Sequence, residues 1–340
     1  MGDRDASMAI VEGHRFSLTD LGRALYPACG FTKRDAIFYY YCVAESLLPH
    51  LVDRPVALLA PTAGGSGRAW EVGPPRGAPP WVRTMRVRRQ PRHPGADSVA
   101  RVDHRFLITD ASSLLWAANL GALELRVPLW RAGDDPPAST VDTLAFHLEP
   151  TGQADAKQCA SLALSLRDAL SAAGLDLAHA TTDGRDGLQV LAALATPLRA
   201  EAAHELARRT VRSIGPSTRG TRTSGLGHRR RGGVRIKWHQ DDPSRTVVAP
   251  YSLSAGGFPW VATPITWDEL DAVARHDDAA PLRFTSRDAL ARVERLGDLL
   301  APLVRALAPG AARAPRPTSW LWPASPAAPR GTRVPLGAAG

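Results

Sequence analysis

The sequence predicts an α+β fold, with mixed sheets of α/β type and flanking helices. Helical and strand patterns alternate irregularly along the chain, which is typical of this class. Hydrophobic residues make up 44% of the 340 residues, a composition that allows a sizeable core and disfavours wholesale disorder. No apolar run approaches the ~18–20 residues of a membrane span, and no signal-peptide pattern opens the chain. We therefore expect a cytoplasmic protein with no membrane partner.

The elements are expected in a definite order. Residues 1–14 lack apolar periodicity and should form a flexible leader. Thr32 marks a helix start, because charged residues follow it and apolar residues then recur at helical spacing as far as Leu48. Gly and Pro make residues 61–80 a loop with short strands. Further helices are predicted over residues 116–123, 154–173, 198–212 and 286–307, and strands over residues 144–148, 189–195, 232–238 and 246–250.

The end of the chain has a different composition. Residues 308–340 are rich in Pro, Ala and Arg, a composition that cannot bury a core and predicts a disordered tail. Within this tail, Trp320 and Trp322 either anchor a partner or pack the tail against its own domain. Residues 15–307 remain as a single domain.

Positive charge is concentrated in one segment. The net charge is +9, and residues 206–240 contain ten basic residues and no acid. A neutral body with one basic segment indicates a polyanion partner, because neutralising phosphates releases counterions. The alternative is a solvated loop in an Arg-rich protein. The ten residues are Arg208, Arg209, Arg212, Arg219, Arg222, Arg229, Arg230, Arg231, Arg235 and Lys237.

The sequence lacks the motifs of disulfide-bonded proteins, zinc sites, nucleotide-binding loops and hydrolase triads. Cys29, Cys42 and Cys159 are scattered, which suits free thiols in a reducing compartment better than disulfides. His228 and His239 have no Cys or His partner at zinc spacing. The chain also has no Walker loop, GxGxxG motif or Ser/His/Asp arrangement.

Six segments carry a family resemblance. They lie at residues 18–35 (LTDLGRALYPACGFTKRD), 119–130 (NLGALELRVPLW), 182–190 (TDGRDGLQV), 236–242 (IKWHQDD), 246–252 (TVVAPYS) and 263–270 (TPITWDEL). In this order and spacing they resemble the polymerase domain of bacterial end-joining ligase D, in the archaeo-eukaryotic primase superfamily. The resemblance covers roughly residues 15–305. It implies a primase-polymerase-like fold and a role in bacterial non-homologous end joining.

The resemblance locates a metal site whose ligands have changed. The family holds two metal ions on an Asp-x-Asp pair of one strand and a third Asp on a neighbouring strand, and the metals neutralise the triphosphate and activate the primer hydroxyl. The matching residues here are His147, Glu149 and Lys237. Imidazole is a poor ligand for Mg²⁺, and an ammonium group repels it. Lys237 is expected to pair with Glu149 or to touch a DNA phosphate. We expect a pseudoenzyme without a metal cofactor.

The nucleotide-binding positions have changed too. The family's Ser-x-Lys-Gly-x-His-like loop matches residues 184–189, so Asp186 replaces its lysine and Gln189 its histidine, with Arg185 between. A further family histidine is Arg126 here. The basic pair expected after Val56 is replaced by Leu58 and Leu59. Arg245 keeps a basic phosphate-binding position, for a triphosphate or for DNA.

The DNA-end positions are better kept. The family contacts a 5′-phosphate with two basic residues, and the resemblance places Arg23 and Lys33 there. Lys33 lies at a helix start, which also favours a phosphate. The alternative is that both are ordinary surface cations. The family's stacking aromatics match Ala69 and Trp70, so Trp70 is expected to stack on a base. Trp81 is expected to pack in the core.

Two functional hypotheses follow. The first is a protein that binds double-stranded DNA ends with a 5′-phosphate at the nucleoid and assists an end-joining ligase or end-bridging protein. The second is an active DNA or RNA nucleotidyltransferase, an end-joining polymerase or primase, whose Mg²⁺ or Mn²⁺ site is rebuilt from other acids. The candidate acids are Glu149, Asp183, Asp186, Asp241 and Asp242. A scaffold without a DNA role is a third possibility.

Overall fold

The computed structural model describes most of the chain. The described residues are 7–61, 69–89, 101–133, 140–152, 154–214, 222–223, 233–238, 245–276 and 282–307. The expected tail and much of the basic segment lie outside these ranges. So do His228, His239, Asp241, Asp242, Trp320 and Trp322.

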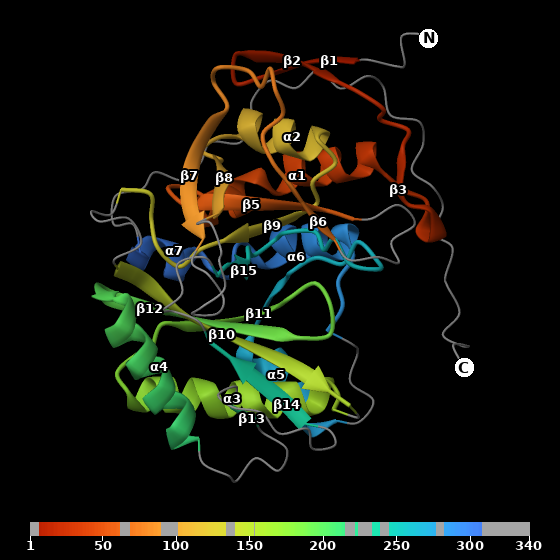
Figure 1. Cartoon of the computed structure of the whole chain (residues 1–340). Coiled ribbons are helices and arrows are strands. Elements are labelled where there is room, and N and C mark those ends of the chain that lie inside the picture. Colours follow the sequence, from red (N-terminus) through yellow and green to blue (C-terminus); the bar gives the residue numbers. More distant parts are fainter. Residues whose placement is uncertain are drawn as a thin grey trace.

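Two sheets face each other, and most of the helices lie on their outer sides (Figure 1). The first sheet has the strand order β15-β9-β5-β8-β7, with β6 paired to β5. The buried residues of α1 and α2 share one core with β5 and β9. The bounds are α1 (Lys33–Leu47), α2 (Ala111–Asn119), β5 (Pro55–Ala60), β6 (Trp70–Val72), β7 (Arg83–Arg89), β8 (Arg101–Leu107), β9 (Glu124–Val127) and β15 (Val247–Val248).

The second sheet carries the longest strands. Its order is β13-β14-β10-β12-β11-β16, and its pairs are antiparallel except β13 with β14. Helices α3, α4 and α5 share a core with its outer face. The bounds are β10 (Thr140–Thr151), α3 (Ala156–Ala172), β11 (Ala178–Thr182), β12 (Leu188–Arg199), α4 (Ala200–Ser213), β13 (Arg222–Thr223), β14 (Gly233–Lys237), β16 (Pro264–Ile265) and α5 (Trp267–Arg275). The α+β fold class is therefore confirmed.

The N-terminal segment differs from the expected leader. Residues from 7 onward form a hairpin of β1 (Ser7–Val11) and β2 (His14–Leu18). Alternate side chains of both strands, such as Val11 and Phe16, are buried in the first core. Each strand has only five residues, so the alternation of buried and exposed side chains is too brief to be recognised in the sequence. The short β3 (Ala24–Tyr26), η1 (Pro27–Cys29) and β4 (Phe31–Thr32) lead from the hairpin into α1.

Helix α1 begins where the sequence predicted it. Thr32 accepts the Asp35 backbone N–H, and the Asp35 carboxylate accepts the Thr32 backbone N–H at 2.8 Å, which completes a capping box. A short 3-10 turn, η2 (Leu48–His50), extends the helix.

The described helices include none that is both long and apolar enough to cross a membrane.

The predicted helix over residues 286–307 is wrong as a single element. It is divided into α6 (Ser286–Leu296) and α7 (Ala301–Leu307). Gly297 lies between them with a φ of +70° and a ψ of −168°, a backbone conformation that glycine adopts far more readily than other residues and that ends the helix. Because of this break, α7 packs against β12 of the second sheet, whereas α6 packs against α1, the helix that covers the first sheet.

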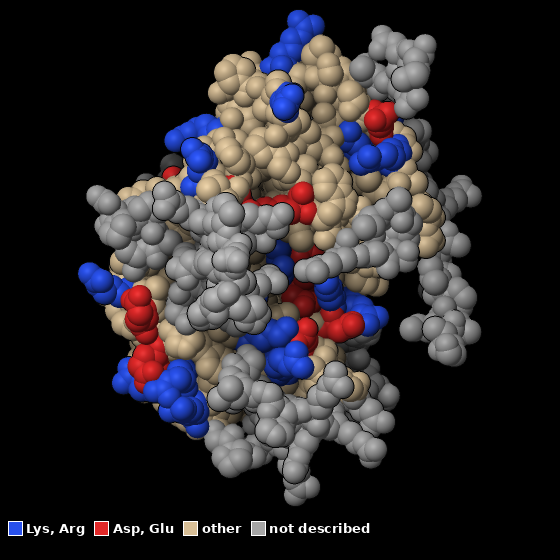
Figure 2. All heavy atoms as spheres, viewed as in Figure 1, with Lys and Arg blue, Asp and Glu red and all other residues tan. Residues whose placement is uncertain are grey.

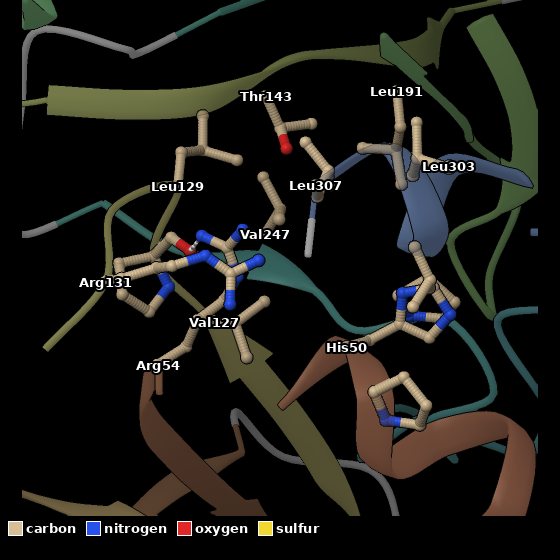
Figure 3. Close-up of a pocket in the computed structure, with 14 residues that line it drawn as sticks. His50, Arg54, Val127, Leu129, Arg131, Thr143, Leu191, Val247, Leu303 and Leu307 are labelled. Carbon is tan, nitrogen blue, oxygen red and sulfur yellow. Dashed lines mark hydrogen bonds between the residues drawn. The ribbon is translucent and has the colours of Figure 1, made fainter. Parts of the chain in front are cut away.

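A small cavity of about 50 Å³ lies where α7 meets both sheets (Figure 3). Leu303 and Leu307 of α7 line it together with His50. At the edge of the cavity, Arg54, the residue before β5, donates to the two carboxylate oxygens of Asp142 on β10 at 2.6 and 2.7 Å. Arg131 donates to the same carboxylate at 2.7 Å. This buried ion pair fixes the first half of the molecule to the first residues of β10.

Candidate functional site

A pocket of about 320 Å³ lies between the two sheets. Strands β9, β10, β12, β14 and β15 and the turn after β11 supply its walls. Figure 2 shows that basic and acidic side chains gather together at the middle of this face of the molecule. The pocket brings together most of the residues predicted from the sequence. They are Arg126, His147, Glu149, Arg185, Gln189, Lys237 and Arg245.

The register of the second sheet places three predicted residues in one row. His147 on β10 is paired with Gln189 on β12 and with Lys237 on β14. Directly paired residues project to the same face of a sheet, so all three side chains face the pocket. Phe146 and Leu148 alternate with them and enter the core under the opposite face.

Lys237 pairs with Glu149. Its Nζ atom lies 2.6 Å from Glu149 Oε2, and Arg235 Nη1 lies 3.3 Å from the same oxygen. Burial acts to raise the pKa of Glu149, but the hydrogen bond and charge of Lys237 outweigh it and lower the pKa. The side chains of Lys237 and Glu149 are 30% and 35% exposed, and both line the pocket. This contact confirms the first of the two roles expected for Lys237.

His147 has a partner that the sequence did not predict for it. Its Nε2 atom lies 2.8 Å from Asp183 Oδ2. Asp183 also accepts the backbone N–H groups of Arg185 at 2.8 Å and Gly187 at 3.1 Å. Burial acts to raise the pKa of Asp183, but these hydrogen bonds and His147 lower it. The buried, ionised carboxylate therefore holds the imidazole in place.

These groups do not fit a pair of Mg²⁺ ions. Mg²⁺ requires several oxygen ligands in octahedral geometry, whereas Glu149 is occupied by an ammonium group and Asp183 by an imidazole. Within the described residues, no group of three or more His, Cys, Asp or Glu side chains is arranged to hold a metal ion. Asp186 lies outside this pocket, in a separate hollow where it contacts Arg283.

A buried glutamate that was not predicted from the sequence supports the wall of the pocket formed by Arg126 and Arg185. Glu124 on β9 is 1% exposed. Arg185 Nη2 lies 3.0 Å from its Oε2 atom and Arg126 Nε lies 3.2 Å from its Oε1 atom. Its position as the single acid within the apolar run from Leu120 to Leu125 could have indicated a buried carboxylate with a basic partner. Gln189, on the same side, donates to the Val248 carbonyl at 3.2 Å.

The two predicted 5′-phosphate residues lie together in the first half of the molecule. Lys33 is 3% exposed, and its Nζ atom donates to the Thr19 carbonyl at 2.6 Å. Its backbone N–H donates to the Arg23 carbonyl at 2.9 Å. Burial, and then the charge of Arg23, lower the pKa of Lys33 to about 8, against a smaller opposing effect of Asp20. The guanidinium of Arg23 lies against Gly121, where a Cβ atom would come within 2.3 Å of it.

The aromatic residues have separate environments. Trp70 on β6 is 53% exposed. Trp81 packs against the first core and stacks on His14, with 4.5 Å between ring centroids, as expected for a core residue. Leu58, at a position that is basic in the family, is fully buried in the first core.

Comparisons with known proteins agree on one family. The sequence profile described as "LigD, primase-polymerase domain" matches residues 32–300. The multifunctional non-homologous end joining DNA repair protein LigD of Mycobacterium tuberculosis H37Rv is 33% identical over 306 residues, which cover 86% of this chain and 37% of that protein. The corresponding protein of Mycolicibacterium smegmatis is 32% identical over 297 residues, which cover 85% of this chain and 36% of that protein. The chain thus spans little more than a third of the length of these relatives.

A solved structure extends the match to the fold. The polymerase domain of M. tuberculosis ligase D, solved in complex with DNA, is 31% identical and superposes with a TM-score of 0.74. The match covers 85% of this chain and 98% of that domain. The chain therefore belongs to the LigD primase-polymerase domain family.

Proposed function

We propose that this chain binds DNA ends in bacterial non-homologous end joining and does not transfer nucleotides. The observation that carries the proposal is the 2.6 Å contact between Lys237 and Glu149. Lys237 stands where the family resemblance places a metal-binding carboxylate. An ammonium group in that position changes the local charge by two units and opposes divalent cations.

The chemistry of the family explains why this exchange matters. Nucleotidyl transfer depends on metal ions that hold the triphosphate and stabilise the attacking and leaving oxygens. In this pocket the metal positions hold His147, Glu149 and Lys237, and their side chains are already engaged in ion pairs within the protein. No described group replaces the missing oxygen ligands.

Binding of a DNA end is supported by Arg23 and Lys33. Two cations lie close enough for the charge of one to lower the pKa of the other. A phosphate between them relieves that repulsion and gains charge-assisted hydrogen bonds. Trp70 adds an exposed aromatic surface on which a base can stack. The relative that is solved with DNA has the same fold, which favours the same class of ligand.

A primer-extension assay tests the loss of nucleotide transfer. The substrate is a gapped duplex with a 5′-phosphate, supplied with nucleoside triphosphates and either Mg²⁺ or Mn²⁺. We expect no extension above a heat-denatured sample, with the M. tuberculosis polymerase domain as the positive control. Template-directed extension by this chain contradicts the proposal and favours the metal-dependent nucleotidyltransferase.

A binding assay tests the DNA-end role. Affinity for a 5′-phosphorylated duplex should exceed that for the 5′-hydroxyl form and should fall steeply with salt. The preference should vanish in the Arg23→Ala, Lys33→Ala double variant and persist in Arg275→Ala, which removes an exposed arginine of α5 that pairs with Asp271. Absence of salt-dependent DNA affinity indicates a scaffold without a DNA role. With DNA binding established, an end-joining ligase or an end-bridging protein is the partner to test on the same end.

A further inference from the structure

We propose that Arg126 and Arg185, held by the buried carboxylate of Glu124, form a clamp that binds a phosphate ester without a metal ion. The inference rests on the proposed function, because it assigns a ligand to a pocket that does not hold the metals of its family. The ligand class is a phosphate ester, supplied by a nucleotide or by a DNA strand.

Both guanidinium groups form ion pairs with Glu124, and that of Arg185 also donates a hydrogen bond to it. Arg126 Nε and Arg185 Nη2 lie 3.2 and 3.0 Å from different oxygens of the Glu124 carboxylate. Glu124 is itself fixed, since its Oε2 atom also accepts the Ala255 backbone N–H at 3.0 Å. One carboxylate from inside the protein thus holds two cations at the pocket wall.

The backbone of Arg185 is held in position as well. Asp183 Oδ1 accepts the N–H groups of Arg185 and Gly187 and so fixes the turn from residue 183 to residue 187. The side chain of Arg185 passes over Gly256, where an added Cβ atom would lie 3.5 Å from Arg185 Nε. Little conformational freedom remains to be lost when a ligand binds.

Both guanidinium groups keep N–H donors after these contacts. A guanidinium group carries five N–H donors in a planar fork that matches phosphate. Arg126 and Arg185 are 35% and 52% exposed, so part of each faces the pocket. In the described part of the chain, Glu124 is the only carboxylate in an ion pair with either of them.

The pocket as a whole carries an excess of positive charge. Four basic side chains, Arg126, Arg185, Lys237 and Arg245, line it against two acidic ones, Glu149 and Asp183. Both acids are engaged by other groups, Glu149 by Lys237 and Asp183 by His147. Glu124 lies behind the wall and pairs with Arg126 and Arg185, so the four cations exceed the three acids by one and still favour an anion where relatives need metal ions to accept a triphosphate.

The test measures binding in EDTA, so that no metal ion contributes. One arm titrates ATP calorimetrically, and the other follows a 5′-hydroxyl duplex with a 3′ overhang by fluorescence anisotropy. We expect at least one ligand to bind the native chain, and its affinity to fall by about tenfold or more in Arg126→Gln, Arg185→Gln. The arm that responds identifies the source of the phosphate. The matched control, Arg275→Gln, should bind as the native chain does.

Two further variants keep the test decisive if the double variant unfolds because Glu124 is left buried without a partner. Glu124→Gln, Arg126→Gln, Arg185→Gln removes all three charges and should also lose binding. Arg126→Lys, Arg185→Lys keeps the charge without the fork and should bind with intermediate affinity. Affinity for both ligands that is unchanged in all three variants overturns the clamp. So does binding that appears only with Mg²⁺. Because the extension assay measures nucleotide transfer separately, failure of the clamp is distinguishable from failure of the proposed function.

Discussion

Lys237 on β14 and Glu149 on β10 are diagonal neighbours across the second sheet, with 2.6 Å between Nζ and Oε2. Both residues line the pocket, at positions where the family resemblance places metal ligands. An internal cation therefore neutralises a carboxylate that would otherwise attract a metal ion.

Restoring carboxylates should restore metal affinity. The His147→Asp, Lys237→Asp variant removes the ammonium group and places two new acids beside Glu149, so Mn²⁺ affinity should rise by at least about tenfold over the native chain. Electron paramagnetic resonance of free Mn²⁺ measures it. Lys237→Met is the matched control, since it removes the cation without adding a ligand. Equal Mn²⁺ affinity of the native chain and the double variant argues against internal neutralisation.

The 5′-phosphate preference should depend on pH through Lys33. The pKa of Lys33 in the free protein is about 8, below its ordinary value of 10.5. Below pH 8 the ammonium is present to receive the phosphate, and above it binding must first add a proton, so the preference should decline between about pH 8 and pH 10. The Lys33→Arg variant stays charged and should show a flat profile. Anisotropy titrations of 5′-phosphorylated and 5′-hydroxyl duplexes give the ratio, and a native profile as flat as that of the variant contradicts the role of Lys33.

His50 should make the fold sensitive to acid. It is buried, and burial, opposed by Asp298 and assisted by Arg54, lowers its pKa from 6.5 to about 4. The unfolded chain binds the proton more readily than the folded one. The free energy of unfolding should therefore be highest above pH 6.5 and should fall by up to about 3 kcal/mol as the pH drops toward 4. Thermal unfolding between pH 7 and pH 4 measures this slope. The His50→Leu variant should lose that part of the slope, and an identical slope in both proteins rules out His50 as its source.

Gly187 is required by the contact between His147 and Asp183. A Cβ atom at this position would lie 2.6 Å from Asp183 Oδ2, 2.8 Å from the Leu148 carbonyl oxygen and 3.0 Å from His147 Nε2. Gly187→Ala should therefore destabilise the fold by about 1–3 kcal/mol. Gly73→Ala is the control, because an added Cβ atom there meets nothing within 4 Å. Chemical unfolding of both variants measures the difference, and equal stabilities contradict the crowding.

The sequence was informative wherever a local signal or a motif existed. The Thr32–Asp35 capping box is a local signal, and α1 begins there. The family motif located His147, Glu149 and Lys237, and the structure brings all three into one pocket. The pairing of Lys237 with Glu149 followed from placing opposite charges on neighbouring strands.

Contacts between distant segments were harder to predict. Glu124 supports Arg185 across 61 positions and His147 meets Asp183 across 36, and neither pairing leaves a periodic trace in the sequence. The break at Gly297 was missed because apolar residues continue at helical spacing on both sides of it. The β1–β2 hairpin was missed because each of its strands has only five residues.

The row formed by Gln189, His147 and Lys237 also bears on how this lineage can evolve. Two of its members, His147 and Lys237, stand at metal positions of the family and lie on different strands, so carboxylates at both positions require two separate substitutions. His147→Asp alone would set a new carboxylate against Asp183, and Lys237→Asp alone would leave Glu149 facing a like charge. Each of these single substitutions should lower the stability of the fold, because it places like charges together before a metal ion can bind between them. The packing around His147 and Lys237 therefore opposes single substitutions toward a carboxylate set, and both positions must change together before a metal ion can offset the cost.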